Sequence, residues 1–396
     1  MTDMKKTIRE KAKDHFDYMV ETRRYLHRNP EISFEEFETT EYIVHELKKL
    51  GIEAIRPLET GCIGIIEGKK SDRSIALRAD IDALPMDEEG DHKKEFMSEK
   101  PGVAHCCGHD AHIANMLGVA NILTEVKDEI EGKVLLVFQP AEEKLPGGGK
   151  VMLESGVLQK HGVQKIFGLH TYPYLEPGKI GTKAGPLMAG TNEFEIDIIG
   201  QGGHAAAPHQ AVDPIVMAAT IISQFQTVVS RSIDPTQPAV LTVGKITGGS
   251  AHNVIPEKVS ILGTVRTFSD EVTNTIHNRM EAIVKSVTES AGGSYKANFQ
   301  LGYPPVLNDE ESTNLLLNTA RSVLGEKNVN ELDRPLMAGE DFAFYQKEIP
   351  GAFFYLGSGS DEADSKWSWH HPRYNVDEKC FLTGASLMAG VALGVE

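Results

Sequence analysis

The sequence has few cysteines and no long apolar run. Only four of its 396 residues are cysteine, and two of these, Cys106 and Cys107, are adjacent. We therefore expect no disulfide framework and a reducing, cytoplasmic location. No apolar run approaches the roughly 18 residues that a membrane-spanning helix needs. The first residues lead into a charged amphipathic stretch instead of an apolar signal-peptide core, so no secretory signal is expected.

Basic residues are scarce relative to acidic ones. The chain has 40 lysines and arginines against 57 aspartates and glutamates, which gives a formal net charge of −17. This excess of negative charge argues against a nucleic-acid-binding protein. The apolar content of 40% and the charged content of 24% are typical of a folded globular protein. Because the chain is too long for one compact core, two domains are expected.

The first part of the chain alternates helical and strand patterns. Apolar residues at helical spacing predict a helix over 5–28, and a second predicted helix, 39–50, ends before Gly51. Unbroken apolar runs predict strands of a sheet that is covered by helices on both faces. The predicted strands are 63–66, 75–77 and 134–138, and a further helix is expected over 111–126.

The middle of the chain has a different pattern, because its strands alternate apolar and charged residues as half-exposed strands do. Its elements follow the order β-α-β-β-α-β, the ferredoxin-like arrangement. They are predicted at 194–198, 213–229 (with Asp213 as N-cap), 239–246, 258–266, 270–290 and 295–301.

The last part returns to α/β character, with a helix near 311–324, a strand at 353–356 and a final helix from Asp377. The predicted fold is therefore an α/β catalytic domain with a mixed sheet and an inserted, smaller α+β domain. The predicted boundaries are 1–185 and 304–396 for the catalytic domain and 186–303 for the insertion.

Side chains that bind metals recur in a fixed order along the chain. Three of these groups are expected where a short apolar run ends, and strand ends are where α/β proteins place their chemistry. Taken singly, each group has an ordinary explanation: a buried free cysteine, a solvated acidic turn or a core histidine. Together, a thiolate, imidazoles and adjacent carboxylates predict a site for two divalent cations that activate water. The groups are Cys107-Gly108-His109-Asp110, Glu142-Glu143, Leu169-His170 and His370-His371.

These motifs and several others make the chain similar, from end to end, to the co-catalytic dinuclear metallopeptidases. The resemblance is to the branch that contains aminoacylase, hippurate hydrolase and the auxin-conjugate (indole-acetyl amino acid) hydrolases. It implies a zinc-peptidase-like catalytic domain and an inserted domain that serves as a lid and in dimerisation. The matching segments are 23–31, 77–85, 105–112, 139–143, 202–209, 253–256, 263–267 and 339–342.

The resemblance implies a role for each metal-site residue. Cys107 would be shared by the two metals, Glu142 would be the general base, and Asp82 would orient a ligand. In the His370-His371 pair, His370 is favoured by its match to the family pattern, and His371 remains an alternative. The remaining ligands implied are His109, Glu143, His170 and His370.

Three residues of the insertion are implied to contact the substrate. His204 would reach the active site of a partner subunit and stabilise the oxyanion of the tetrahedral intermediate. Arg266 and Asn253 would face the cleft and bind the substrate carboxylate and amide. For His204 and Arg266, a local structural role is the alternative explanation. The resemblance implies a homodimer or a higher homo-oligomer.

The predicted activity is hydrolysis of the amide bond of N-acyl amino acids by a metal-activated water. A dipeptidase or carboxypeptidase would use the same metals and base, so it remains the close alternative. A metal-dependent binding module is the more distant alternative, but such a module would not need Glu142 as a general base. The thiolate favours zinc and the carboxylates also suit manganese, and cobalt also occurs in the family. The expected partners are a small N-acyl amino acid or dipeptide, with no nucleic acid and no membrane.

Overall fold

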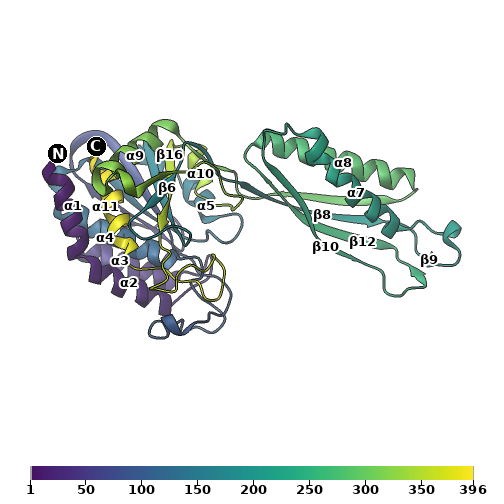
Figure 1. Ribbon diagram of the computed structural model, residues 1–396, viewed down its shortest axis with the longest axis horizontal. Coiled ribbons are helices and arrows are strands. Elements are labelled where there is room, and N and C mark those ends of the chain that lie inside the picture. The colour runs from purple at the N-terminus through teal and green to yellow at the C-terminus, as the bar shows by residue number, and fades with distance from the viewer. Residues whose placement is uncertain (1, 396) are drawn as a thin grey trace. The chain divides into compact units, whose positions relative to one another are not determined.

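The computed structural model describes residues 2–395, and the chain divides into two compact units. The first unit comprises Met1–Leu187, Leu307–Arg334 and Asp341–Glu396. The second comprises Met188–Val306 and Pro335–Glu340, so it is inserted into the chain of the first. Figure 1 labels the elements of both units.

The first unit is built on a large mixed sheet, as predicted. Its central strands β4, β3, β5 and β16 run parallel to one another, and the strands outside them include antiparallel pairs. In spatial order the strands are β1 (Glu53–Ile55), β2 (Cys62–Glu67), β4 (Glu131–Gln139), β3 (Lys69–Asp80), β5 (Lys165–Tyr172), β16 (Gly351–Gly357), β6 (Ile180–Thr182) and β15 (Val329–Glu331).

The buried stretches of the central strands are mostly apolar because helices cover both faces of the sheet. Every residue of β16 is buried, and β4 is buried from Val134 onward. Such strands have no solvent-facing side on which polar residues would alternate. In Figure 1, α1, α2, α4 and α11 lie on one side of the sheet and α5 lies on the other. The helices are α1 (Thr2–Asp14), α2 (Phe16–Arg28), α3 (Phe37–Lys49), α4 (His109–Glu125), α5 (Gly148–Glu154), α6 (Val157–Lys160), α9 (Glu310–Leu324), α10 (Ala343–Gln346) and α11 (Cys380–Leu393).

Two helix predictions in this unit are wrong at a boundary. The helix predicted over 5–28 is two helices, interrupted at His15; α1 packs mainly against α11, and α2 packs mainly against α4. The final helix begins at Cys380 and not at Asp377. The Asp377 carboxylate accepts hydrogen bonds from Ser360 and from the Lys379 backbone, which holds this residue in the preceding turn.

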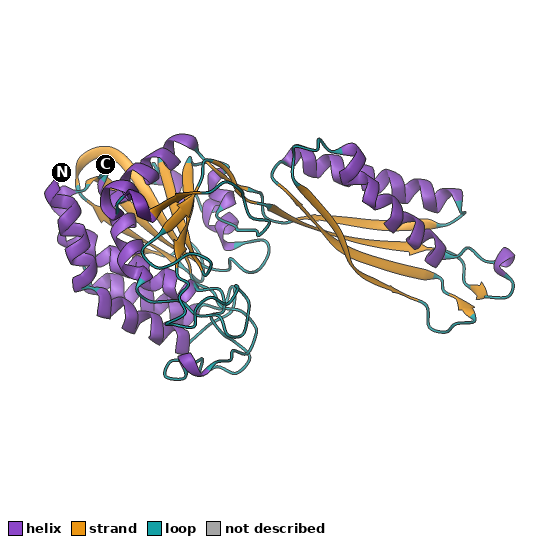
Figure 2. Cartoon of the chain, in the orientation of Figure 1, coloured by secondary structure: helices purple, strands orange, loops and turns teal. Residues whose placement is uncertain are grey.

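The second unit is a four-stranded antiparallel sheet with two helices on one face (Figure 2). The elements follow the chain in the order strand, helix, strand, strand, helix, strand, and the Asp213 carboxylate caps the first helix by accepting from Ile215 and Val216. Apolar side chains such as Phe194 and Ile196 pack against the helices, whereas Glu195 is exposed. The elements are β8 (Gly190–Ile199), α7 (Pro214–Ser232), β10 (Ala239–Gly248), β12 (Lys258–Thr267), α8 (Asp270–Ser290) and β13 (Ser294–Leu301).

Short strands complete the described part of the chain: β7 (Gly185–Met188), β9 (Gly203–His204), β11 (Val254–Ile255) and β14 (Val306–Asn308). All four cysteines are buried free thiols. Among residues 2–395, no helix combines the length and the apolar character that a bilayer crossing requires.

Candidate metal centre

The metal-binding side chains of the first unit gather at the carboxyl ends of its parallel strands. Strand β3 ends at Asp80 and β4 at Gln139, and His170 lies near the end of β5. This edge is where open α/β sheets form their sites. One detail of the prediction is wrong: no strand precedes Cys107, because residues 101–104 form a turn and a single bridge between Leu84 and Ala104.

Gly108 shapes the loop that carries the first two candidate ligands. It adopts a left-handed conformation with a φ of 96°, and His109 then starts α4. A Cβ at Gly108 would lie 2.5 Å from Thr171 Oγ1 and 2.8 Å from Tyr374 Oη. Glycine is therefore required both for the backbone conformation and for the close approach. As a result Cys107 and His109 face the site from a tight turn and not from an extended loop.

Asp82 orients His109 and is itself held in place. The Nδ1 of His109 lies 2.9 Å from the Asp82 carbonyl oxygen and 3.1 Å from Asp82 Oδ1. The Nδ1–H group therefore donates to Asp82, and Nε2 is available to the site. Asp82 Oδ2 accepts from Ser33 Oγ (2.6 Å) and from the Glu143 backbone (3.0 Å). Burial opposes ionisation of Asp82, but these hydrogen bonds outweigh it and lower its pKa.

The acidic pair lies in the loop after β4. Ala141, the residue before the pair, has a positive φ of 52°, and its N–H donates to Glu36 Oε1 at 2.7 Å. Glu142 is 7% exposed, and the side chain of Glu143 is 12% exposed. A positive φ at an alanine is strained, and here the surrounding contacts hold it.

His170 lies within β5, not after it as the sequence predicted, and faces Cys107. Its Nδ1 lies 2.8 Å from the Thr171 carbonyl, and its Nε2 lies 3.3 Å from the Cys107 sulfur. The ring is packed edge-on against Trp369, with 4.8 Å between ring centroids. Because Nδ1 has a carbonyl partner, Nε2 is free to act as a ligand atom.

The sequence did not single out the residues that support this strand. His112 Nε2 accepts from the Thr171 backbone at 3.0 Å, and His112 Nδ1 lies 2.5 Å from Asp80 Oδ1. Asp80 Oδ2 accepts from Arg78 at 2.7 Å, and all of these side chains are buried. Asp80 and His112 fall within motifs of the family resemblance, and that was the only signal that could have identified them.

His370, and not His371, reaches the cluster. His370 has a φ of 62°, its N–H donates to the Cys106 carbonyl at 2.9 Å, and its Nε2 lies 3.0 Å from Glu143 Oε1. His371 stacks on Trp367 with 4.5 Å between ring centroids, and its Nδ1 accepts from the Arg373 backbone.

The charge balance of the cluster suits divalent cations. Potential ligand atoms lie within 4.8 Å of one another in five groups of the described residues, and three of these overlapping groups contain the predicted ligands. Burial first, and then the Glu143 and Glu142 carboxylates, raises the pKa of Cys107 well above its usual range. At His109 the carboxylates of Asp80 and Asp82 overcome burial and raise the pKa to about 10. His109 Nε2 has no hydrogen-bond partner among residues 2–395. These three groups are Cys107-His109-His170, Cys107-Glu143-His370 and His109-Glu142-Glu143, and the other two are Asp80-His109-His112 and Glu142-Glu340-Asp341.

In the second unit, His204 and Asn253 lie close together at one end of the sheet. His204 is on β9, which pairs with β11, and His204 is opposite Val254, the residue after Asn253. Both residues are exposed. His204 Nδ1 accepts from the Ala206 backbone at 3.0 Å, and the Asn253 carbonyl accepts from Ala205.

Arg266 lies at the opposite end of the same sheet. It pairs with Thr191 in the register of β12 and β8, whereas Lys258, at the end near β9, pairs with Ile199. At about 3.3 Å per residue the two ends are on the order of 25 Å apart. Arg266 is half-buried, burial lowers its pKa, and it donates to the Asn192 carbonyl at 3.4 Å. The second unit therefore does not bring Arg266 together with His204 and Asn253.

A buried cluster of a thiol, imidazoles and carboxylates at the carboxyl edge of a mixed sheet defines a metal-dependent hydrolase. Residues 76–394 match the model of Peptidase family M20/M25/M40, and the chain belongs to this family. The family resemblance carried by the sequence motifs is thereby confirmed.

Relatives and solved structures agree with this assignment. The N-acetyl-L-cysteine deacetylase of Bacillus subtilis (strain 168) is 45% identical over 369 residues, which cover 92% of this chain and 85% of that protein. The N-acyl-L-amino acid amidohydrolase of Geobacillus stearothermophilus is 45% identical over 290 residues, which cover 73% of this chain and 77% of that protein. The crystal structure of the Bacillus subtilis YXEP protein, described as a dinuclear metal binding peptidase from the M20 family, matches with a TM-score of 0.82 and 35% identity. That match covers 96% of this chain and 98% of the YXEP chain.

Proposed function

We propose that this protein hydrolyses the amide bond of N-acyl amino acids with a pair of divalent cations. The observation that carries the proposal is the buried cluster around Cys107, in which ligand atoms from a loop, a strand and a helix lie within 4.8 Å of one another. The names of the two 45% identical relatives, a deacetylase and an amidohydrolase of N-acylated amino acids, support the substrate class.

Five residues would hold the metals. The thiolate of Cys107 would be shared, and Asp82 would keep His109 in the tautomer that presents Nε2. When bound, the cations would polarise the scissile carbonyl and bring the pKa of a water to about 7. The thiolate and imidazoles favour zinc, the carboxylates also suit manganese, and cobalt fits the same donors. The proposed ligands are Cys107, His109, Glu143, His170 and His370.

Glu142 would serve as the general base. It is 7% exposed and lies next to Glu143, and its carboxylate is within 4.8 Å of the ligand atoms of His109 and Glu143. A carboxylate held there would take the proton of the attacking water and deliver it to the departing amine. A positioned base of this kind contributes a factor of roughly 10²–10⁴ to the rate.

The second unit would be a ferredoxin-like lid and dimerisation domain. His204 would stabilise the oxyanion in the active site of a partner subunit, with Asn253 beside it, while Arg266 would bind the substrate carboxylate within its own subunit. The distance between His204 and Arg266 within the second unit supports this division between two subunits. Residues at opposite ends of one sheet are too far apart to contact the same small substrate, so each would come from a different chain. A cytoplasmic location belongs to the same proposal, since the site needs a reduced Cys107.

A peptidase that acts on dipeptides is the second candidate. The YXEP protein, described as a peptidase, is 35% identical to this chain and superimposes along nearly its whole length. The same base and ligands would serve both reactions, so the acyl group accepted by the site is what separates them.

The test is a comparison of substrates with a matched pair of variants. Amine release is measured for N-acetyl, N-benzoyl and indole-acetyl amino acids and for simple dipeptides, with protein reconstituted with zinc or manganese. We expect the acyl amino acids to be hydrolysed faster. Glu142→Gln should bind the same amount of metal and lose turnover by roughly 10²–10⁴-fold. Glu154→Gln, an exposed carboxylate on α5, is the control and should keep wild-type turnover.

The outcomes separate the candidates. Faster hydrolysis of dipeptides would establish the peptidase and reject the N-acyl preference. Normal turnover in Glu142→Gln would reject Glu142 as the base. Two bound metals without hydrolysis of any substrate would contradict the proposed function.

A further inference from the structure

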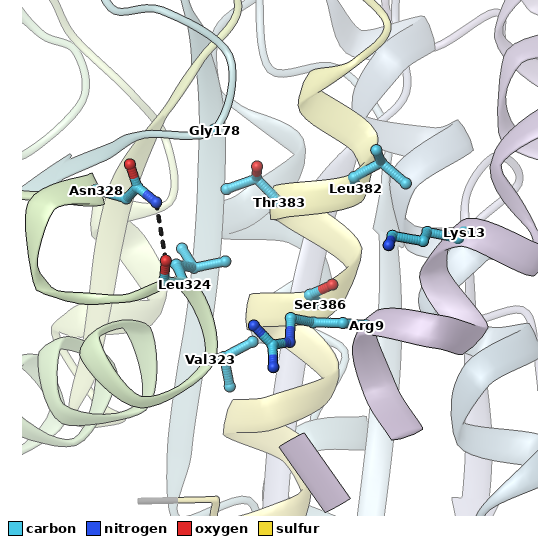
Figure 3. A pocket seen from close by; sticks show the side chains of 9 residues that line it. All are labelled: Arg9, Lys13, Gly178, Val323, Leu324, Asn328, Leu382, Thr383 and Ser386. Atoms are coloured by element: carbon cyan, nitrogen blue, oxygen red, sulfur yellow. Dashed lines mark hydrogen bonds between the residues drawn. The ribbon is translucent and has the colours of Figure 1, made fainter. Parts of the chain in front are cut away.

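A cavity lies in the helical layer of the first unit, between α1, α9 and α11. Its volume is about 190 Å³, and none of the metal-site residues lines it. Figure 3 shows Arg9 and Lys13 extending from α1 toward α11, where Thr383 and Ser386 lie. Because the two groups of residues share no member, the cavity is distinct from the metal centre.

The cavity carries positive charge without a compensating carboxylate. Arg9 and Lys13 are four residues apart, so they lie on the same face of α1. Neither has a hydrogen-bond or ion-pair partner within residues 2–395, and no acidic residue lines the cavity. Several acidic groups near the lining elements are paired with other cations: Glu10 with Lys6, Glu176 with Lys179 and Glu326 with Arg321. Asp14, which follows Lys13 on α1, has no ion pair among the described residues. Arg9 and Lys13 are both exposed, so water also reaches these two cations.

The helix opposite presents two hydroxyl groups to these cations. Thr383 and Ser386 are the only hydroxyl residues of α11, and their three-residue spacing puts them on one face. They are 5% and 2% exposed, and neither hydroxyl makes a hydrogen bond to any described residue. Elsewhere the hydroxyls of helical residues such as Thr124 bond the carbonyl four residues earlier. Neither oxygen is fully enclosed by protein, so both hydroxyls are open to the cavity, where water or a ligand can bond them.

The rest of the lining is mostly apolar, with Val323, Leu324 and Leu382. The Asn328 amide donates to the Leu324 carbonyl, which leaves its side-chain oxygen available. We propose that this cavity binds a small organic anion, with a carboxylate held by Arg9, Lys13 and the two hydroxyls and a short aliphatic part against the leucines. Charge-assisted bonds to the carboxylate and a concave apolar wall are the features of such sites.

The experiment measures the binding of isovalerate to the full-length, metal-loaded protein by calorimetry at low ionic strength, where the attraction is least screened. We expect the wild-type protein to bind it. Removing both cations in R9Q/K13Q should weaken binding by roughly tenfold or more, since each charged hydrogen bond contributes strongly. The variant T383V/S386A, which keeps the shape and both charges, should weaken it by roughly threefold.

The control variant K48Q/K70Q removes two exposed lysines that do not line the cavity and changes the net charge equally. It should bind isovalerate within about twofold of wild type, because general attraction between exposed charges is weak. Equal weakening in K48Q/K70Q and R9Q/K13Q would overturn the proposal, as would an absence of binding to wild type. Inorganic phosphate serves as a second probe. Phosphate binding without isovalerate binding would overturn the assignment to an organic anion.

Discussion

The metal cluster of the first unit and the candidate substrate residues of the second unit are built in opposite ways. In the cluster, His109 is buried and oriented by Asp82, which itself accepts hydrogen bonds from Ser33 and Glu143. In the second unit His204 is exposed, and its Nδ1 accepts from a residue two positions away. The side chains of the cluster are fixed by contacts from distant parts of the chain, whereas the His204 side chain is held only from its own loop, although its backbone pairs with β11.

This difference indicates how the work of catalysis would be divided. A buried, cross-braced cluster keeps its geometry before the substrate arrives, which is what metal binding and general base catalysis need. An exposed histidine on a short two-stranded ladder acquires a fixed environment only against another surface. We therefore expect variants of the first kind to lose metal or chemistry, and variants of the second kind to lose turnover while keeping metal.

The largest effect expected for the exposed set is that of His204→Ala. Losing one donor to the oxyanion lowers kcat by roughly 10²–10³-fold. Metal content, measured by elemental analysis, should stay at the wild-type level because His204 is in no ligand group of the described residues. His209→Ala, an exposed histidine of the same loop, is the control and should keep kcat. Full activity in His204→Ala would remove His204 from the mechanism.

A smaller effect is expected for Asp82→Asn in the buried set. The asparagine amide cannot accept all the hydrogen bonds that the Asp82 carboxylate accepts from His109, Ser33 and Glu143. His109 would then be less well oriented, so the affinity for metal should fall by roughly 10–100-fold. Competition with a chelator measures this affinity. Asp72→Asn, which alters an exposed carboxylate, should leave it unchanged. Wild-type affinity in Asp82→Asn would show that the hydrogen bond to His109 does not govern metal binding.

Arg266→Ala tests the role of the end of the second unit's sheet that lies opposite His204. If Arg266 binds the substrate carboxylate, KM should rise by roughly tenfold for acyl amino acids with a free carboxylate. KM for the same compounds with an amidated carboxylate should not change. Arg231→Ala on α7 controls for the loss of charge. Equal KM changes for the free and the amidated substrates would support a structural role for Arg266.

A separate effect, on stability and not on activity, concerns Glu36, which is fully buried beside the acidic pair. Burial first, and then Asp82, raises its pKa from 4.5 to about 7. Between pH 4.5 and about pH 7, Glu36 is ionised in the unfolded chain but still protonated in the folded chain. The free energy of unfolding therefore falls as the pH rises. In the metal-free protein, Glu36→Gln should therefore gain stability over wild type across this window, by up to roughly 3 kcal/mol at pH 8.

Urea denaturation at pH 5 and pH 8 measures this difference for Glu36→Gln. The exposed neighbour Glu35→Gln should show the same small difference at both values. A difference for Glu36→Gln that does not grow with pH would show that Glu36 is ionised in the folded protein throughout.

The candidate ligand residues could be picked out from the sequence because each belongs to a short local motif, and their role as ligands stays a prediction. Cys107 and His109 are two residues apart, and Glu142 and Glu143 are adjacent, so their chemistry is visible without knowledge of the fold. A sheet covered by helices on both faces was also predictable, because buried strands have unbroken apolar runs.

The supporting residues could not be predicted in the same way. Asp80 and His112 are brought together by the packing of α4 on β3, and His112 reaches Thr171 across 59 residues of sequence. The position of Arg266 at the far end of the sheet follows from strand register, which no local motif contains.

The most direct test of the proposed division between two chains is complementation between two inactive variants. Glu142→Gln subunits keep His204 but lack the base, and His204→Ala subunits keep the base. If His204 acts in the partner's active site, mixing and reassociating equal amounts should restore about a quarter of wild-type activity, since half of the dimers then contain one complete site. If both residues act within one chain, every site in the mixture lacks one of them and no activity returns. That result would contradict a site completed by the inserted unit of a second chain.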